Sequence, residues 1–417
     1  MFGFANFLLL ALFAAAVFDL IFALARGGGL RGALHGLWNT PHLLFGQQLA
    51  EWRLQLGRIL FAAGLAAYEI SVVFCNSMAR QNWAWVQGVM SPVLEWLAFL
   101  CFGAKILFGT RYTWRELLAG GALYFIARWV YFNSQNIWWI GIVVAVLAAK
   151  DIPLCRPLQV YFASGCAAMA VVLALHFAGI VAPDLTSERM GALRGTYGYG
   201  HPNTFGGLVF GLVLAYALLR AQKVRWVDCL LVFAVGVFLL VGLAVGLVFC
   251  RLRAGHSVPR WWPGTCAGMV GLTAAVSYLL PLLVIKVGPW NNDIGPAWLA
   301  KLDSLLTCRI SLTWMAYRLL DVKIAGQVFN WPTVDNSFAF ALFQFGPVVA
   351  VLLGILFAAA LWGHAKQGRR VEVCCLFAML AYAYMEVQPF HLTTNPTALL
   401  LCGAVFAQAS ARWQKIE

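Results

Sequence analysis

Residues 188–207 read Glu-Arg-Met-Gly-Ala-Leu-Arg-Gly-Thr-Tyr-Gly-Tyr-Gly-His-Pro-Asn-Thr-Phe-Gly-Gly, and they separate two long apolar runs, at about residues 157–181 and 204–221. A run of roughly 17 to 25 mainly apolar residues is long enough to cross a bilayer as a helix. The order of apolar run, polar loop and apolar run therefore predicts two membrane-spanning helices joined at one membrane face.

The polar loop carries the residue types of an anion site. Arginine binds phosphate groups through paired, charge-assisted hydrogen bonds, and glycine lets backbone N–H groups come close to a ligand. The candidate ligand-binding residues in this loop are Arg189, Arg194, Gly200, His201 and Asn203. A histidine before proline is also common in turns, so turn formation is the alternative interpretation of His201.

Composition places the chain in the membrane. Of its 417 residues 62% are hydrophobic and only 11% are charged, and the mean hydropathy is +0.80, whereas soluble domains are about 45–50% apolar. The formal charge of +13 does not indicate a nucleic-acid partner, because the Lys and Arg residues fall in small groups between apolar runs instead of forming one basic face. That distribution is typical of cytoplasmic loops in membrane proteins.

Further apolar runs extend this pattern along the chain. We expect an all-α polytopic integral membrane protein with about 11–13 transmembrane helices. It would form a single transmembrane domain over residues 1–417, with two larger outer loops at about 182–203 and 288–335. Residues 227–250 lie between two basic groups, which a single crossing would place on opposite sides of the membrane. We therefore expect a hairpin of two short half-passes there, broken near Gly236 or Gly242.

The second outer loop contains a further set of candidates. Leucines at helical spacing predict an amphipathic helix at the outer membrane surface over Pro296 to Lys323, with Arg309 on it. Asp335 and Asn336 open the next span. An arginine in an outer loop is often only a solvated charge, and an aspartate at a helix start is often an N-cap. Glu386 is harder to explain in this way, because carboxylates at membrane depth are costly and usually face a cavity.

Six short stretches, in this order, together resemble one family. They are Tyr112 to Leu117; Ala149 to Ile152; Arg194 to Asn203; Leu302 to Arg309 leading to Gly326-Gln327; Asp335 to Phe338 with Gly346; and Glu386 followed by Asn395. The chain resembles the Wzy-type polysaccharide polymerases of bacterial capsule and exopolysaccharide loci, relatives of the O-antigen ligases. It departs from them at residues 241–246, Val-Gly-Leu-Ala-Val-Gly, where such relatives often have a Ser-Arg pair.

The resemblance implies glycosyl transfer at the outer face of the bacterial plasma membrane. A growing glycan would move from polyprenyl diphosphate to a sugar hydroxyl of an incoming lipid-linked repeat unit. Arg309, with Arg189 and Arg194, would stabilise the leaving diphosphate, and Asp335, or else His201 or Glu386, would take the proton. Gly200, Asn203 and Asn336 would contact substrate. The polyprenyl diphosphate supplies the energy, so we expect no cofactor and no metal.

The expected partners are the polyprenyl-diphosphate-linked oligosaccharide, membrane lipids, a flippase and a chain-length regulator, with no nucleic acid. Two alternatives remain. A ligase would transfer finished glycan to another acceptor, and its relatives tend to show a histidine where this chain has Asp335. A non-enzymatic transporter or flippase would show inverted repeats and charged residues deep in several helices.

Overall fold

The computed structural model describes residues 2–25, 29–46, 48–181, 187–189, 192–221, 223–234, 238–252, 258–284 and 296–406. Backbone packing divides the chain into two compact units. Unit 1 comprises residues 1–125, 141–219 and 392–417, and unit 2 comprises residues 126–140 and 220–391. The single domain expected from the sequence stays a prediction.

Unit 1 is built mainly from long helices, with two short antiparallel strand pairs. Its helices are α1 (Phe2–Ala25), α2 (Gly29–Asn39), α3 (Ala50–Cys75), α4 (Ala79–Asn82), α5 (Ser91–Phe108), α8 (Cys155–Phe177), α9 (Pro202–Leu219) and α18 (Cys402–Val405), with most of α6 (Trp114–Ser134) and α7 (Ile137–Ala148). A π-helical turn, Val86–Met90, precedes α5, and a 3-10 helix, Pro396–Leu401, precedes α18.

The two strand pairs lie in loops of unit 1. Strand β1 (His42–Leu43) pairs with β2 (Arg111–Tyr112), and His42 lies opposite Tyr112. Strand β3 (Ser187–Arg189) pairs with β4 (Ala192–Arg194), and Ser187 lies opposite Arg194. The loop that separates the two apolar runs therefore begins with a short hairpin.

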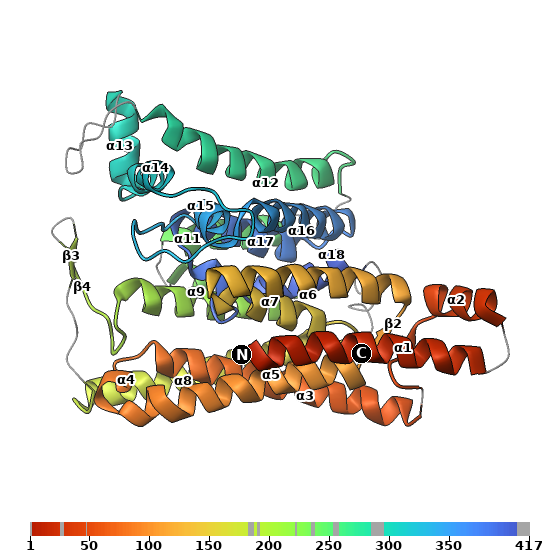
Figure 1. Cartoon of the computed structure of the whole chain (residues 1–417). Coiled ribbons are helices and arrows are strands. Elements are labelled where there is room, and N and C mark those ends of the chain that lie inside the picture. The colour runs from red at the N-terminus through yellow and green to blue at the C-terminus, as the bar shows by residue number, and fades with distance from the viewer. Residues whose placement is uncertain are drawn as a thin grey trace. The chain divides into compact units, whose positions relative to one another are not determined.

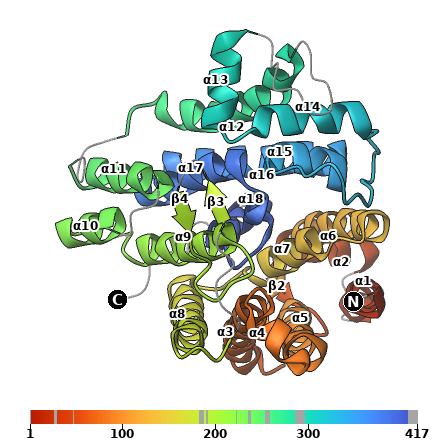
Figure 2. The same cartoon turned by 90° about the vertical axis from the view of Figure 1, so that its left-hand side faces the viewer.

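Helix α3 is the centre of packing in unit 1. It lies between α5 and α8 (Figures 1 and 2). Gly57 of α3 meets Gly109, just after α5, so closely that a Cβ on Gly57 would lie 2.9 Å from the Gly109 Cα. Small residues at such a crossing let two backbones approach, which is how membrane helices gain packing energy without a hydrophobic driving force.

Unit 2 contains the remaining helices. They are α10 (Trp226–Ala234), α11 (Phe238–Leu252), α12 (Trp262–Leu279), α13 (Ala297–Leu305), α14 (Arg309–Leu319), α15 (Ser337–Phe340), α16 (Pro347–Lys366) and α17 (Arg370–Met385). Two 3-10 helices, Leu280–Leu283 and Gln388–Phe390, and a π-helical turn, Ala341–Phe345, complete it. Helix α12 packs along α16, and α11 packs on α17.

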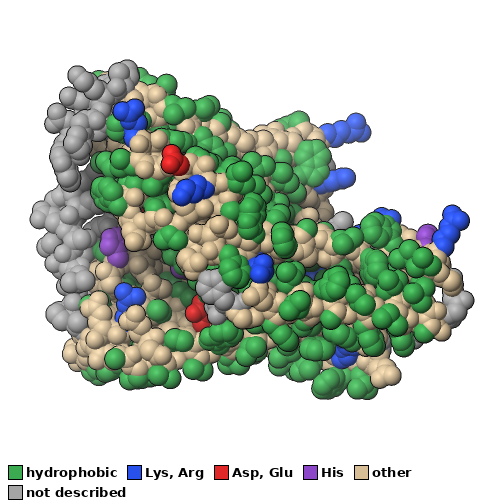
Figure 3. All heavy atoms as spheres, viewed as in Figure 1, with side chains coloured by type: hydrophobic (Ala, Val, Ile, Leu, Met, Phe, Trp, Pro, Cys, Tyr) green, Lys and Arg blue, Asp and Glu red, His purple; other side chains and the backbone are tan. Residues whose placement is uncertain are grey.

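The helices have the length and surface of a multi-pass membrane protein. Seven of those described are long and apolar enough to cross a bilayer: Gly3–Ala25, Ala50–Cys75, Val86–Phe108, Cys155–Phe177, Pro202–Leu219, Trp262–Leu283 and Pro347–Lys366. Large apolar side chains on α1 face outward, among them Phe7, Leu10 and Phe13, and Figure 3 shows hydrophobic side chains over much of the visible face. The all-α polytopic fold class is confirmed, and the total of about 11–13 spans stays a prediction.

Two expectations about local structure have different outcomes. The single amphipathic helix over Pro296 to Lys323 is wrong, because the chain breaks into α13 and α14 at residues 306–308, where Thr307 and Cys308 have positive φ. Residues 227–250 form two helices, α10 and α11, that pack on each other as a hairpin would. The residues between them, 235–237, lie outside the described part of the chain.

Candidate functional site

Three ionisable side chains from separate segments of unit 2 meet in what we call the Arg309 cluster, formed by Arg309, Asp335 and Glu386. The Arg309 Nη2 lies 2.7 Å from Glu386 Oε1 and 4.0 Å from Asp335 Oδ2. Arg309 is the first residue of α14, Asp335 lies just before α15 and Glu386 is the C-cap residue that follows α17. The fold thus brings together three of the four residues that the sequence suggested as catalytic.

The position of Arg309 depends on the helix break before it. Asp303 of α13 is fully buried, and its carboxylate accepts hydrogen bonds from the backbone N–H groups of Ile310, at 2.7 Å, and Ser311, at 3.2 Å, and from the Ser311 hydroxyl. These are donors that the first turn of a helix leaves unpaired. A carboxylate from α13 therefore caps α14 and fixes where Arg309 begins the new helix.

The Arg309 guanidinium is held on several sides. Its Nε donates to the Met385 carbonyl, and its Nη1 donates to the carbonyls of Leu306, at 3.2 Å, and Thr307, at 3.5 Å. Only 5% of the residue is exposed. Since Nε and Nη1 donate to backbone carbonyls, Nη2 is the nitrogen that faces the two carboxylates.

The two carboxylates differ in their access to solvent. The Glu386 side chain is 14% exposed and is bound directly by Arg309. The Asp335 side chain is 31% exposed and lies at the outer limit of an ion pair. A carboxylate that is near a cation, yet partly open, can accept a proton from a substrate hydroxyl. Within this cluster Asp335 fits that role better than Glu386.

Asn336 has a structural task that the sequence did not assign to it. Its Oδ1 accepts hydrogen bonds from the backbone N–H groups of Phe338, at 2.9 Å, and Ala339, at 3.1 Å, so it is the N-cap of α15. Its Nδ2 donates to the Ser277 hydroxyl. The cap is therefore Asn336 and not Asp335, which leaves the carboxylate of Asp335 directed to the cluster, while the role of Asn336 in substrate binding stays a prediction.

The loop that leads to Asp335 is fixed by two glycines. Gly326 and Gly346 both have positive φ. A Cβ on Gly326 would overlap the Gln344 carbonyl, and a Cβ on Gly346 would overlap the Ile324 carbonyl. The Gln327 N–H also donates to the Gln344 oxygen, at 3.2 Å. The two backbone segments can approach this closely only because residues 326 and 346 have no side chains. Their contact holds the loop that precedes Asp335 in place.

The other candidates lie in unit 1. His201 precedes α9, and its Nδ1 accepts a hydrogen bond of 3.1 Å from the Asn203 backbone N–H, which agrees with the turn interpretation. The Gly200 N–H donates to the Asn76 carbonyl. Arg189 and Arg194 end β3 and β4, and the positions of their side chains lie outside what the structure describes. The anion site in this loop therefore stays a prediction.

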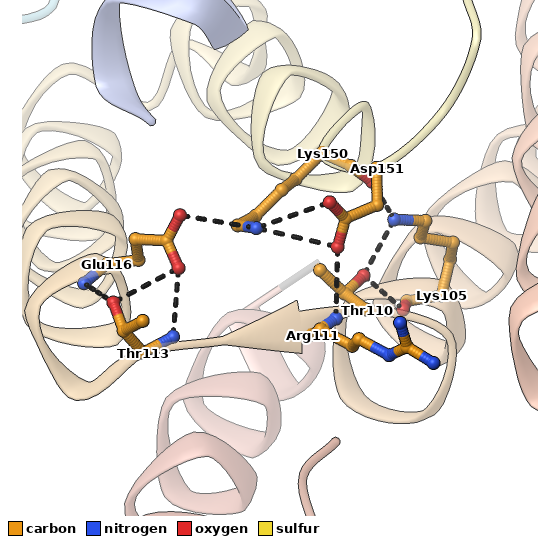
Figure 4. A network of polar contacts seen from close by, with 7 residues as sticks. All are labelled: Lys105, Thr110, Arg111, Thr113, Glu116, Lys150 and Asp151. Atoms are coloured by element: carbon orange, nitrogen blue, oxygen red, sulfur yellow. Dashed lines mark hydrogen bonds and ion pairs between the residues drawn. The ribbon is translucent and has the colours of Figure 1, made fainter. Parts of the chain in front are cut away.

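A second ionic group, the Lys150 network, lies in unit 1 (Figure 4). The Lys150 Nζ is 3.3 Å from Glu116 Oε1 and 3.4 Å from Asp151 Oδ1, and the Lys105 Nζ donates to Thr110 and to the Lys150 carbonyl. Glu116 also accepts from the N–H of Thr113 in a capping box at the start of α6. The network joins two stretches that carried the resemblance. Its members are Lys105, Thr110, Arg111, Thr113, Glu116, Lys150 and Asp151.

This network has little sequence signal because its members lie at or near the ends of three different helices, although the Thr113-x-x-Glu116 spacing indicates the capping box. Among the described residues, no group of three or more His, Cys, Asp or Glu side chains is placed to hold a metal ion. No protein-family model, curated protein or solved structure matches the chain. The long apolar helices define a class, a multi-pass α-helical membrane protein.

Proposed function

We propose that this chain is a polysaccharide polymerase that transfers a growing glycan from polyprenyl diphosphate to the hydroxyl of a lipid-linked repeat unit. The reaction would take place at the outer face of a bacterial plasma membrane. The observation that supports the proposal is the Arg309 cluster, since Asp335 and Glu386 come from segments far apart in the chain and both lie within 4.0 Å of Arg309.

In the proposed reaction, the acceptor hydroxyl attacks the anomeric carbon of the growing glycan, and the bond from that carbon to the diphosphate oxygen breaks. Asp335 takes the hydroxyl proton, and the electron pair leaves with the polyprenyl diphosphate. Arg309 places Glu386 and supplies positive charge beside the reacting groups. As the resemblance implies, Arg189 and Arg194 would stabilise the negative charge of the diphosphate. Guanidinium N–H groups of Arg309 would add to this if the substrate displaces them from their present hydrogen-bond partners.

The test uses the purified protein with a synthetic polyprenyl-diphosphate repeat unit and neither nucleotide nor added metal. We expect a ladder of oligomers with release of polyprenyl diphosphate. Arg309→Lys keeps the charge but loses the planar set of donors, so the rate should fall by about two to three orders of magnitude. Arg318→Lys is the matched control, because Arg318 lies over the Trp314 ring on the same helix and outside the cluster.

Full activity in Arg309→Lys would remove Arg309 from the mechanism. Transfer to an added second acceptor, without a ladder, would identify a ligase instead. A transporter is the second candidate, and a specific observation favours it: Glu69 is an almost fully buried carboxyl group inside the membrane-spanning helix α3. Movement of intact lipid-linked unit between leaflets, with no bond broken, would support that candidate.

A further inference from the structure

Glu69 is buried inside unit 1, within a helix that can span the membrane. It lies on α3, which is long and apolar enough to cross a bilayer, and only 2% of the residue is exposed. The helix ends at Cys75, so at 1.5 Å per residue Glu69 lies about 9 Å from that end. This end leads into α4, and the opposite end of α3 carries Arg53 and Arg58. The positive-inside rule places the Glu69 end at the outer side.

The fold makes room for the carboxyl group. Gly165 of α8 lies opposite, and a Cβ on Gly165 would come within 2.8 Å of Glu69 Oε1. Leu212 of α9 fills the other side of the same space, at 2.6 Å from that Cβ position. Gly165 thus leaves the space that the Glu69 side chain occupies between three helices.

No hydrogen bond and no ion pair to Glu69 is formed within the part of the chain that the structure describes. The titratable side chains that interact electrostatically with it are neutral ones: Tyr68 on α3, Tyr161 and Cys166 on α8, and Tyr199 in the loop before α9. An unpaired carboxylate in apolar surroundings costs far more free energy than a neutral carboxylic acid. The geometry therefore favours the form that carries a proton.

We propose that Glu69 is a proton-binding site within the membrane, whose carboxyl group holds its proton at neutral pH and exchanges it with the outer side. Tyr199 lies on the outer side of Glu69. This side chain is fully buried, its residue pairs with Ser77 in a β-bridge just beyond α3, and the Gly198 carbonyl accepts from the Met78 N–H at 2.8 Å. The loop from Gly198 to His201 thus lies over the outer end of α3, between Glu69 and solvent.

This site is independent of the Arg309 cluster, since it needs neither the glycan nor the diphosphate. It adds a protonatable group of the kind that proton relays use in membrane proteins. The proton acceptor is the Glu69 carboxylate, and the donor is water at the outer face, so no further reactant is required.

Infrared spectroscopy of the purified protein in lipid tests the proposal directly. A protonated carboxyl group has a carbonyl stretch that an ionised carboxylate lacks. At pH 7, where exposed carboxyl groups are ionised, the wild-type spectrum minus that of Glu69→Gln should show one protonated-carboxyl band. Glu51→Gln is the matched control on the same helix, because the Glu51 side chain is 84% exposed, and its difference spectrum should show carboxylate bands only.

Transfer of the wild-type protein to D₂O should shift the Glu69 band, because an exchangeable proton becomes a deuteron. Carboxylate bands in the Glu69→Gln difference spectrum, or a protonated band that does not shift in D₂O, would overturn the proposal. Glutamine is neutral and of nearly the same size as a protonated glutamate, so Glu69→Gln should fold with unchanged thermal stability. A markedly stabilised Glu69→Gln variant would also overturn the proposal, because stabilisation is expected when an unpaired, buried charge is removed.

Discussion

The Lys150 network and the Arg309 cluster each centre on one cation that pairs with two carboxylates, but they differ in how far they are enclosed. In the Lys150 network the Lys150 and Glu116 side chains are both almost fully enclosed, and the buried Lys105 donates to Thr110 and to the Lys150 carbonyl beside them. In the Arg309 cluster one of the two carboxylates, Asp335, is partly open and lies 4.0 Å from Arg309. The first arrangement is closed to solvent at Lys150 and Glu116, whereas the second has an accessible proton acceptor.

Under the proposed function, this difference would separate a structural ionic group from a catalytic one. Removing one partner of a balanced, buried pair leaves the other charge stranded, so such a pair resists change. An accessible carboxylate beside a single cation is available to exchange a proton with a ligand, which is the property that catalysis requires. The comparison therefore predicts that the two regions respond oppositely in measurements of rate and of stability.

The largest effect is expected at Asp335. In the proposed mechanism Asp335→Asn removes the proton acceptor but keeps the shape of the side chain, so transfer in the reconstituted assay should fall by about two to four orders of magnitude. Thermal stability should stay within about 0.5 kcal/mol, because the side chain is partly exposed. Asp321→Asn, an exposed aspartate at the start of the same loop, is the control and should retain activity. An active Asp335→Asn variant would move the proton acceptor to another residue.

The next effect concerns stability. Lys150→Met removes the cation between Glu116 and Asp151, so the free energy of unfolding should fall by about 3–5 kcal/mol, as for other broken buried pairs. Thermal unfolding in detergent, followed by tryptophan fluorescence, measures this. Lys366→Met, at an exposed position, removes the same charge and should change little. If Lys150→Met is as stable as wild type but inactive, the two regions have been assigned the wrong way round.

A smaller effect is expected at Asn336. Asn336→Ala removes the N-cap of α15 and the hydrogen bond to Ser277, which should cost about 1 kcal/mol of stability. Any fall in the transfer rate should come from displacement of the neighbouring Asp335, so it should be smaller than the fall in Asp335→Asn. Asn133→Ala, at the exposed end of α6, serves as control in the same unfolding measurement. A full loss of transfer with unchanged stability would instead make Asn336 a substrate contact.

Apolar runs were sufficient to predict the helical membrane fold, because a bilayer demands long helices whose backbone groups bond internally. The ends of elements were less predictable. The leucine spacing continued smoothly across residues 306–308, yet the helix breaks there because Asp303, a residue of the preceding helix, caps the next one. The periodicity of apolar residues indicates which face of a helix packs against its neighbours. It gives no signal for a hydrogen bond between two helices of the kind that Asp303 makes.

The candidate site shows the same division. Arg309, Asp335 and Glu386 were placed at one membrane face from charge and span order, and they lie together in unit 2. Their bonding was not predictable, since the donors of Arg309 are engaged by carbonyls at Leu306, Thr307 and Met385 that carry no sequence signal. Glu69 has little sequence signal for a related reason: one carboxyl group within an apolar run changes the hydropathy of that run very little.

The close packing at Gly326 and Gly346 limits which substitutions this protein can accept. Where two side chains touch, a larger residue at one position can be compensated by a smaller residue at the other. That compensation is not available here, because the backbone carbonyl of Gln344 occupies the space of a side chain on Gly326, and the backbone carbonyl of Ile324 occupies that of a side chain on Gly346. No substitution makes a backbone carbonyl smaller, so variants that keep the loop ahead of Asp335 should keep both glycines.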